Sequence, residues 1–131
     1  MPKIIHTMIR VLDLQKSKSF YQDIFDLKET YCLDYPEFKL LYLRNKHSDF
    51  EIELTFNKNR TVPYELGDGY GHIAFVVNDL DAIHKKINAL GVNAGVINNF
   101  KDKEVLIARF FFISDPDGYK IEILQRNGHY Q

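Results

Sequence analysis

Two histidines and two glutamates recur at matched places in this chain. His6 and His72 each open an alternating apolar stretch, HTMIRV and HIAFVV, and the second histidine follows 66 residues after the first. A glutamate comes later in each case, Glu53 in EIELTFN after 47 residues and Glu122 in YKIEIL after 50 residues. Neutral imidazole nitrogens and carboxylate oxygens together suit a divalent ion such as Ni²⁺, Co²⁺, Zn²⁺, Fe²⁺ or Mn²⁺. The spacing therefore predicts a metal site with two histidine and two carboxylate ligands.

Each of these residues also has an ordinary structural interpretation. A histidine that begins a strand can simply hydrogen-bond a neighbour, and Glu53 on a polar strand face can be solvated. Glu122 lies between two isoleucines, which leaves it few ways into water. The joint recurrence of all four residues favours the metal site. The remaining histidines have no such matched partner: His47, His84 and His129.

The four residues belong to two copies of one pattern. An offset of 66 residues also aligns Asp13 with Asp79. Both aspartates are predicted helix N-caps, because a short carboxylate accepts hydrogen bonds from the free N–H groups of the first turn. Apolar residues then recur at helical spacing, and Gly91 supplies a stop after the second helix. These apolar residues are Phe20, Ile24 and Leu27 in the first copy and Ile83, Ile87 and Leu90 in the second.

Strand candidates follow each predicted helix. They cover residues 38–45 and 49–57 in the first copy and 105–114 and 119–126 in the second, with the turn DPDG at 115–118. Residues 98–104 are predicted to be turn-rich. The fold class is therefore α+β with two βαβββ repeats in a single domain, 1–131, with repeat 1 at about 2–57, a linker at about 58–70 and repeat 2 at about 71–126. One repeat is small to be stable alone, so we expect the two to pack together or against a second chain.

Composition excludes several classes of partner. The formal net charge is −1 and no basic block is present, so neither nucleic acid nor an anionic membrane is an expected partner. Cys32 is the single cysteine, which rules out an internal disulfide and fits a reducing cytosol. No apolar run approaches the roughly 20 residues that span a bilayer, and the first residues lack the apolar core of a signal peptide. We expect a cytoplasmic protein.

Five stretches resemble the glyoxalase I (lactoylglutathione lyase) family in its short bacterial form, within the vicinal-oxygen-chelate superfamily. They are HTMIRVLDL, SFYQDIF, IELTFN, YELGDGYGHIAF and DPDGYKIEIL, and the resemblance extends from His6 to about Leu124. It implies βαβββ repeats that form a cup-shaped mixed sheet around a metal. It also implies His6, Glu53, His72 and Glu122 as metal ligands, a homodimer with metal sites at its interface, and Ni²⁺ or Co²⁺ rather than Zn²⁺.

The resemblance implies an activity as well. The expected reaction is isomerisation of the hemithioacetal of methylglyoxal and glutathione to S-lactoylglutathione, by carboxylate proton transfer through a metal-bound enediolate. Glu122 is the expected base, with Glu53 as a possible partner on the other face of the substrate. Arg10 and Asn57 match residues that hold the γ-glutamyl end of glutathione.

One segment departs from the family pattern. Near the expected glycine end of glutathione the chain has FKDKEVLIARFFF, where Lys101, Lys103 or Arg109 could bind a carboxylate or could simply be solvated. The identity of the thiol therefore stays open. Two alternatives remain: another enzyme of the superfamily, such as an epimerase or a thiol transferase, or a non-catalytic ligand-binding dimer of the same fold. A dioxygenase would use two histidines and one carboxylate, and the fourth ligand argues against it.

Overall fold

The protein consists of two compact units, each built as βαβββ. The structure is a computed structural model and describes residues 1–131. Unit 1 (Met1–Glu65) contains β1 (His6–Arg10), α1 (Leu14–Phe25), β2 (Lys28–Asp34), β3 (Phe38–Arg44) and β4 (Glu51–Asn57). Unit 2 (Leu66–Gln131) contains β5 (His72–Val77), α2 (Leu80–Ala89), β6 (Asn98–Asp102), β7 (Val105–Ser114) and β8 (Lys120–Gln125). The predicted α+β class and the two repeats are confirmed.

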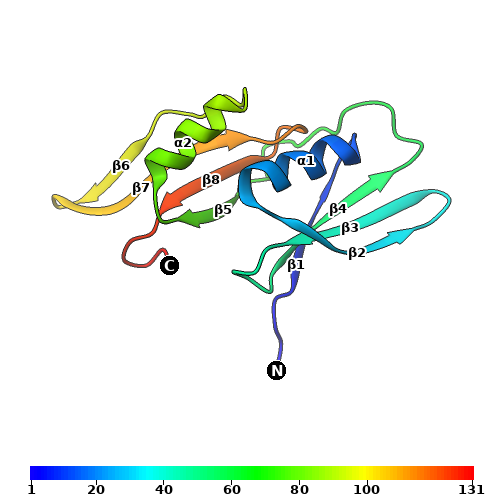
Figure 1. The fold of residues 1–131 in the computed structure, drawn as a ribbon, viewed down its shortest axis with the longest axis horizontal. Coiled ribbons are helices and arrows are strands. Elements are labelled where there is room, and N and C mark those ends of the chain that lie inside the picture. Colours follow the sequence, from blue (N-terminus) through cyan, green and yellow to red (C-terminus); the bar gives the residue numbers. More distant parts are fainter. The chain divides into compact units, whose positions relative to one another are not determined.

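The strands form two four-stranded mixed sheets of the same topology. Their orders are β1-β4-β3-β2 and β5-β8-β7-β6, so the first and last strand of each unit are parallel neighbours (Figure 1). His6 is in register with Glu51, and His72 is in register with Lys120. Alternate residues of a strand share a face. The glutamate two residues beyond each register partner therefore lies on the histidine's face, which explains how residues 47 and 50 positions apart can meet.

Both helices begin at the predicted caps. The side chain of Asp13 accepts a hydrogen bond from the Lys16 N–H at 3.0 Å, and that of Asp79 accepts one from the Ala82 N–H at 3.0 Å. The first helix ends earlier than its apolar spacing predicts, at a left-handed Asp26 with φ 55°. Leu27 is consequently buried but lies outside the helix. Tyr21 is the helix residue that is fully buried in the core, whereas Phe20, which the apolar spacing predicts there, is only half-buried.

Each sheet buries one face beneath its helix (Figure 1). Ile52 and Leu54 of β4 are buried on this face of the first sheet, and Ile121 and Ile123 of β8 are buried on the same face of the second. Burying a side chain of this size contributes about 1.5–3 kcal/mol to stability. The opposite face of each sheet carries the histidine and the glutamate, so the apolar core fixes the face on which the polar pair lies.

The two strands that the sequence did not locate are edge strands. Lys28–Asp34 has no predicted strand, and the prediction of a turn-rich segment at 98–104 is wrong, because Asn98–Asp102 forms β6. The turn there is confined to Lys103 and Glu104, which adopt φ values of 49° and 69°. Both strands lie at the end of a sheet and are largely exposed, so neither carries the alternating apolar pattern that identifies a half-buried strand.

The segment between the repeats has no regular secondary structure, but it is held locally. In residues 58–70, the Arg60 guanidinium lies 4.3 Å from the centre of the Tyr64 ring and donates to the carbonyl oxygens of Val62 and Pro63. The predicted turn after β7 is also present, with the Gly118 N–H donating to the Asp115 carbonyl at 3.0 Å. Neither of the two helices has the length and apolar character that crossing a membrane requires.

Gly95 makes a close backbone contact that predicts a stability effect. Its N–H donates to the Phe112 carbonyl oxygen at 2.9 Å, and an added Cβ would lie 2.9 Å from the same oxygen. We expect Gly95→Ala to lower the free energy of unfolding by about 1–3 kcal/mol, because the backbone must shift to relieve the overlap. Denaturant unfolding measures this. Gly69→Ala is the control, since a Cβ there meets nothing within 4 Å. Equal stability of the two variants would contradict the close approach.

Candidate metal centre

The first half-site, His6 with Glu53, lies on the open face of the sheet in unit 1. The His6 Nε2 atom is 2.9 Å from Glu53 Oε2. Glu53 is only 8% exposed, so the alternative of a solvated glutamate is wrong. The nearby Glu51 carboxylate instead accepts a hydrogen bond from the Thr30 hydroxyl and forms an ion pair with the Arg44 guanidinium. Glu53 is thus the carboxylate that β4 presents to His6.

The second half-site, His72 with Glu122, repeats this arrangement in unit 2. The His72 Nε2 atom is 3.5 Å from Glu122 Oε1, which is longer than the contact in the first half-site. Both side chains are somewhat more exposed than their counterparts, at 42% for His72 and 16% for Glu122. The second half-site is therefore the looser of the two.

An aromatic residue from the next strand packs against the histidine of each half-site. Tyr42 of β3 is in register with Glu53, and Phe112 of β7 is in register with Glu122. The Tyr42 ring lies edge-on to His6 with centroids 5.7 Å apart, and the Phe112 ring lies edge-on to His72 at 5.2 Å. Neither aromatic residue was predicted from the sequence, although alternation within β3 and β7 places them on the correct face.

The Tyr42 phenol lies beside Glu53, its register partner on the neighbouring strand. Burial raises the pKa of Tyr42 above its ordinary value, and the neighbouring Glu53 carboxylate raises this pKa further. The phenol of Tyr42 is therefore harder to ionise than a free tyrosine side chain. The residue at the matching place in the second half-site is Phe112, which has no hydroxyl.

Each half-site fits two adjacent positions around a divalent ion. Nitrogen and oxygen ligands at the bond lengths of zinc sites, about 2.0–2.2 Å, lie about 2.8–3.6 Å from each other in octahedral or tetrahedral coordination. The distances of 2.9 Å and 3.5 Å fall within that range. Neither unit by itself brings together three or more His, Cys, Asp or Glu side chains that could hold a metal.

The predicted substrate-binding residues share the face of the first half-site. Arg10 ends β1 beside Thr55, and Asn57 ends β4 on the same side as Glu53. The Asn57 Nδ2 atom donates to the Tyr64 hydroxyl at 3.1 Å. This hydrogen bond fixes the orientation of the Asn57 amide.

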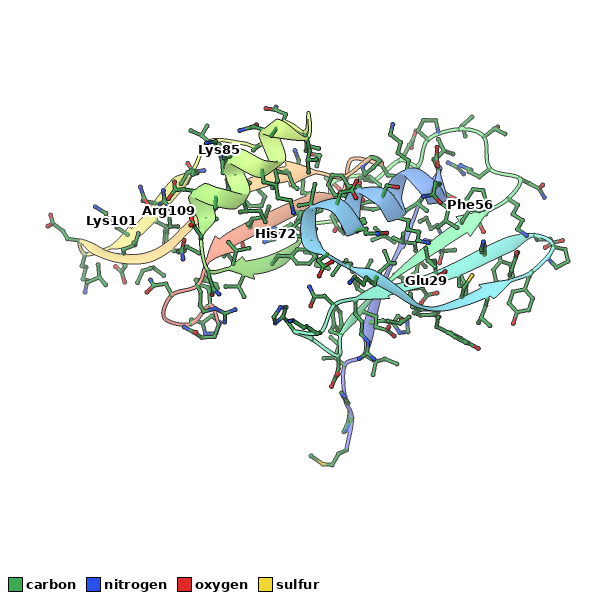
Figure 2. All side chains as sticks on the ribbon, in the orientation of Figure 1. Glu29, Phe56, His72, Lys85, Lys101 and Arg109 are labelled. Atoms are coloured by element: carbon green, nitrogen blue, oxygen red, sulfur yellow. The ribbon has the colours of Figure 1, made fainter.

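The three basic residues that could bind the glycine carboxylate of the thiol lie in different surroundings. Arg109 makes two hydrogen bonds to the Asp81 carboxylate of α2, at 3.0 Å and 2.8 Å, and these lower the pKa of Asp81. Arg109 is therefore on the helix side of its sheet, whereas His72 is on the open side (Figure 2). Lys101 lies on the exposed edge strand β6, and Lys103 lies in the following turn.

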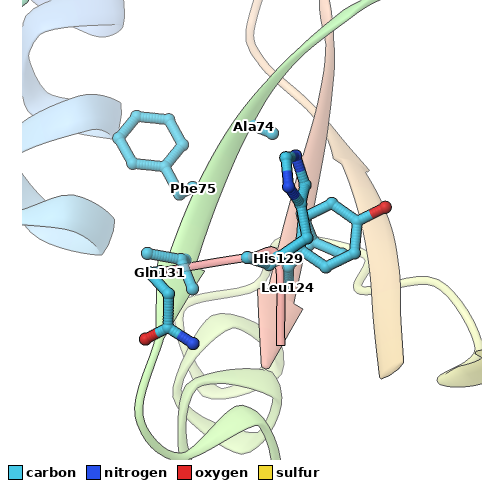
Figure 3. Close-up of a pocket in the computed structure, with 7 residues that line it drawn as sticks. Ala74, Phe75, Leu124, His129 and Gln131 are labelled. Atoms are coloured by element: carbon cyan, nitrogen blue, oxygen red, sulfur yellow. The ribbon is translucent and has the colours of Figure 1, made fainter. Parts of the chain in front are cut away.

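The C-terminal residues cover part of the open face of the second sheet. Asn127 and Tyr130 pair through two backbone hydrogen bonds of 3.0 Å and 2.9 Å, which close a turn. A cavity of about 240 Å³ lies between this turn and the strands, with His129 beside Ala74 and Leu124 (Figure 3). Leu124 is only 4% exposed although it shares the open face with Glu122. His129, which had no predicted role, thus lines a pocket next to the second half-site.

Comparison with known proteins assigns the family. A family model described as "Glyoxalase/Bleomycin resistance protein/Dioxygenase superfamily" matches residues 3–123. The chain belongs to this superfamily. It is 40% identical over 131 residues to a lactoylglutathione lyase of Haemophilus influenzae, covering 94% of this chain and 92% of that one. It is 41% identical over 129 residues to a probable lactoylglutathione lyase of Synechocystis, covering 93% and 94%.

Solved structures of the superfamily agree in fold. Glyoxalase I from Zea mays matches with a TM-score of 0.84 and 27% identity, over 96% of this chain and 45% of that chain. This chain therefore spans about half the length of the maize enzyme. A trypanothione-dependent glyoxalase I from Leishmania major matches with a TM-score of 0.77 and 32% identity, over 95% and 87%. The predicted family is confirmed, and these relatives support the glyoxalase reaction.

Proposed function

We propose that the chain catalyses the isomerisation of the hemithioacetal of methylglyoxal and glutathione to S-lactoylglutathione. The observation that carries this proposal is the pair of matched half-sites, each with an imidazole and a carboxylate on the open face of a sheet. The match to lactoylglutathione lyases over nearly the whole chain supports the same reaction.

The four half-site residues are the proposed ligands of one divalent ion. His6, Glu53, His72 and Glu122 offer two nitrogen and two oxygen donors, and the spacing within each pair suits adjacent ligands. When bound, a divalent ion stabilises the negative charge that develops on the substrate oxygens. We propose Ni²⁺ or Co²⁺ rather than Zn²⁺, following the resemblance to the short bacterial enzymes.

Glu122 is the proposed base. Its carboxylate accepts the proton from the carbon that bears the sulfur and hydroxyl, and the electron pair of that C–H bond forms the enediolate. The same carboxylate then returns the proton to the neighbouring carbon. The hydroxyl proton of the first carbon passes to the oxygen of the second, so the first carbon becomes the thioester carbonyl and the second bears the hydroxyl. The longer contact of Glu122 with its histidine supports this choice over Glu53, which is held more closely.

Arg10 and Asn57 are the proposed anchors for the γ-glutamyl end of the thiol. A guanidinium can pair with a carboxylate through two parallel hydrogen bonds, and Arg10 shares the face of His6. The Asn57 amide is already oriented by Tyr64. One structural relative is a trypanothione-dependent enzyme, so both glutathione and trypanothione are tested as the thiol.

Thioester absorbance tests the function directly. Metal-free protein is reconstituted with Ni²⁺, Co²⁺ or Zn²⁺ and given methylglyoxal with glutathione or with trypanothione. We expect S-lactoylglutathione to form with at least one metal and the rate with glutathione to exceed the rate with trypanothione. Absence of a thioester with every metal and both thiols would contradict the proposed function.

Conversion of each glutamate to its amide separates base from ligand. Glu122→Gln removes the proton acceptor but preserves the shape of the side chain, so kcat should fall about 10²–10⁴-fold. Glu53→Gln should weaken metal binding but retain more of kcat once metal is saturating. Steady-state kinetics at saturating metal measures both, and circular dichroism checks the fold. A Glu122→Gln enzyme with wild-type kcat would exclude Glu122 as the base.

We propose that the functional species is a homodimer with each metal site at the interface. Each chain supplies one copy of each half-site, and the maize enzyme has more than twice the length of chain. Complementation tests the proposal with two inactive variants, His6→Ala/Glu53→Gln and His72→Ala/Glu122→Gln. Co-expression should restore activity, because a mixed dimer contains one intact ligand set. No recovery in an isolated mixed dimer would mean that both half-sites of a working site come from one chain.

A further inference from the structure

The amide of Asn57 is held on one side by the loop that follows β4. Its Nδ2 atom donates to the Tyr64 hydroxyl at 3.1 Å, and both residues are half-buried. The two arms of an amide differ, since Nδ2 only donates hydrogen bonds and Oδ1 only accepts them. With Nδ2 held against Tyr64, the Oδ1 atom on the other arm is left to accept a hydrogen bond from a ligand.

Arg60 holds Tyr64 in place. Its backbone N–H donates to the Asn57 carbonyl at 3.1 Å, which closes a turn directly after the strand. Its guanidinium lies 4.3 Å from the centre of the Tyr64 ring and donates to the carbonyl oxygens of Val62 and Pro63 at 2.7 Å and 3.0 Å. A guanidinium that stacks on a ring while its N–H groups are also engaged restrains the loop and the ring together.

We propose that the Asn57 Oδ1 atom binds the α-ammonium of the γ-glutamyl end of the thiol, and that Tyr64 and Arg60 keep the amide turned so that this acceptor faces the ligand. The inference rests on the proposed function and deepens it, because it assigns one group of the ligand to one atom of the site. Tyr64 and Arg60 are positioning residues, since they act through Asn57.

The charges at this end of the ligand support the assignment. A γ-glutamyl end carries a carboxylate and an ammonium on the same carbon, so it needs a hydrogen-bond donor and a separate acceptor. Arg10 is in register with Thr55, and Asn57 lies two residues further along β4 on the same face. A guanidinium has donors only and repels an ammonium. The acceptor must therefore come from a neighbour, and the amide oxygen of Asn57 is suitably placed.

Three S-methylated ligands test the assignment by calorimetry with Ni²⁺-reconstituted protein. S-methylglutathione carries both charged groups, whereas its glutaryl analogue lacks only the α-ammonium and its 4-aminobutyryl analogue lacks only the α-carboxylate. The wild type should bind each analogue about 10–100-fold more weakly than S-methylglutathione, because each has lost a hydrogen-bonded charged group. Asn57→Ala should abolish the preference over the glutaryl analogue and retain the preference over the 4-aminobutyryl analogue.

Tyr64→Phe tests the positioning role, since it keeps the ring beneath Arg60 and removes only the hydroxyl that accepts from Asn57. The preference for the ammonium should fall about three- to tenfold, because the ligand must then fix the amide as well. In the isomerisation assay, KM for the hemithioacetal should rise while kcat is maintained. Asn59→Ala, in the exposed turn after β4, is the matched control and should retain both preferences. Thermal midpoints check the fold.

Retention of the ammonium preference in Asn57→Ala would overturn the inference, whether or not Tyr64→Phe folds. Its retention in a folded Tyr64→Phe protein would overturn the positioning role. Loss of the carboxylate preference in Asn57→Ala would overturn the assignment of Oδ1, because it would mean that Nδ2 faces the ligand. Failure of the wild type to bind S-methylglutathione would also overturn it. A wild-type protein that shows both preferences but forms no thioester would instead contradict the proposed function and leave this inference standing.

Discussion

The parallel pairing of the first and last strand in each unit is the interaction on which the site depends. It joins β1 to β4 and β5 to β8 across the whole length of a repeat. Its register places each glutamate two positions beyond the residue opposite the histidine, and alternation then puts both side chains on one face. A shift of one residue would turn the glutamate into the apolar core. The buried isoleucines and leucines on the other face oppose that shift, so the core sets the geometry of the polar pair.

The cost of burying a carboxylate explains the rest of the first half-site. An ionised group taken out of water is destabilising unless it is paired and hydrogen-bonded. Glu53 is 8% exposed and has His6 as a partner at 2.9 Å. Glu122 is more exposed and has a longer contact with its histidine. The same topology thus produces one tightly held carboxylate and one that is less restrained.

Much of this arrangement could be predicted from the sequence, because its signals are local and periodic. The repeat was visible in the aligned histidines and aspartates, and both N-caps lie where the pattern places them. Alternation also gave the correct face for Glu53 and Glu122. The edge strands β2 and β6 could not be located in this way, because an exposed edge strand buries no face and leaves no apolar alternation.

The contributions of Tyr42 and of the C-terminal turn depend on neighbours that are distant in sequence. Tyr42 meets Glu53 only through the register of β3 with β4. His129 reaches Ala74 and Leu124 only because the chain closes a turn after β8. The sequence around either residue looks like ordinary strand or tail, so the pairing of the strands had to be known first.

The central proposal is that one ion is bound by one copy of each half-site and that neither half-site binds it alone. Titration of metal-free protein with Ni²⁺ or Co²⁺, followed by calorimetry, tests it in the wild type and in variants that lack both ligands of one half-site. The account predicts one tightly bound ion per chain in the wild type and loss of tight binding in both His6→Ala/Glu53→Ala and His72→Ala/Glu122→Ala. Wild-type affinity in either variant would contradict it.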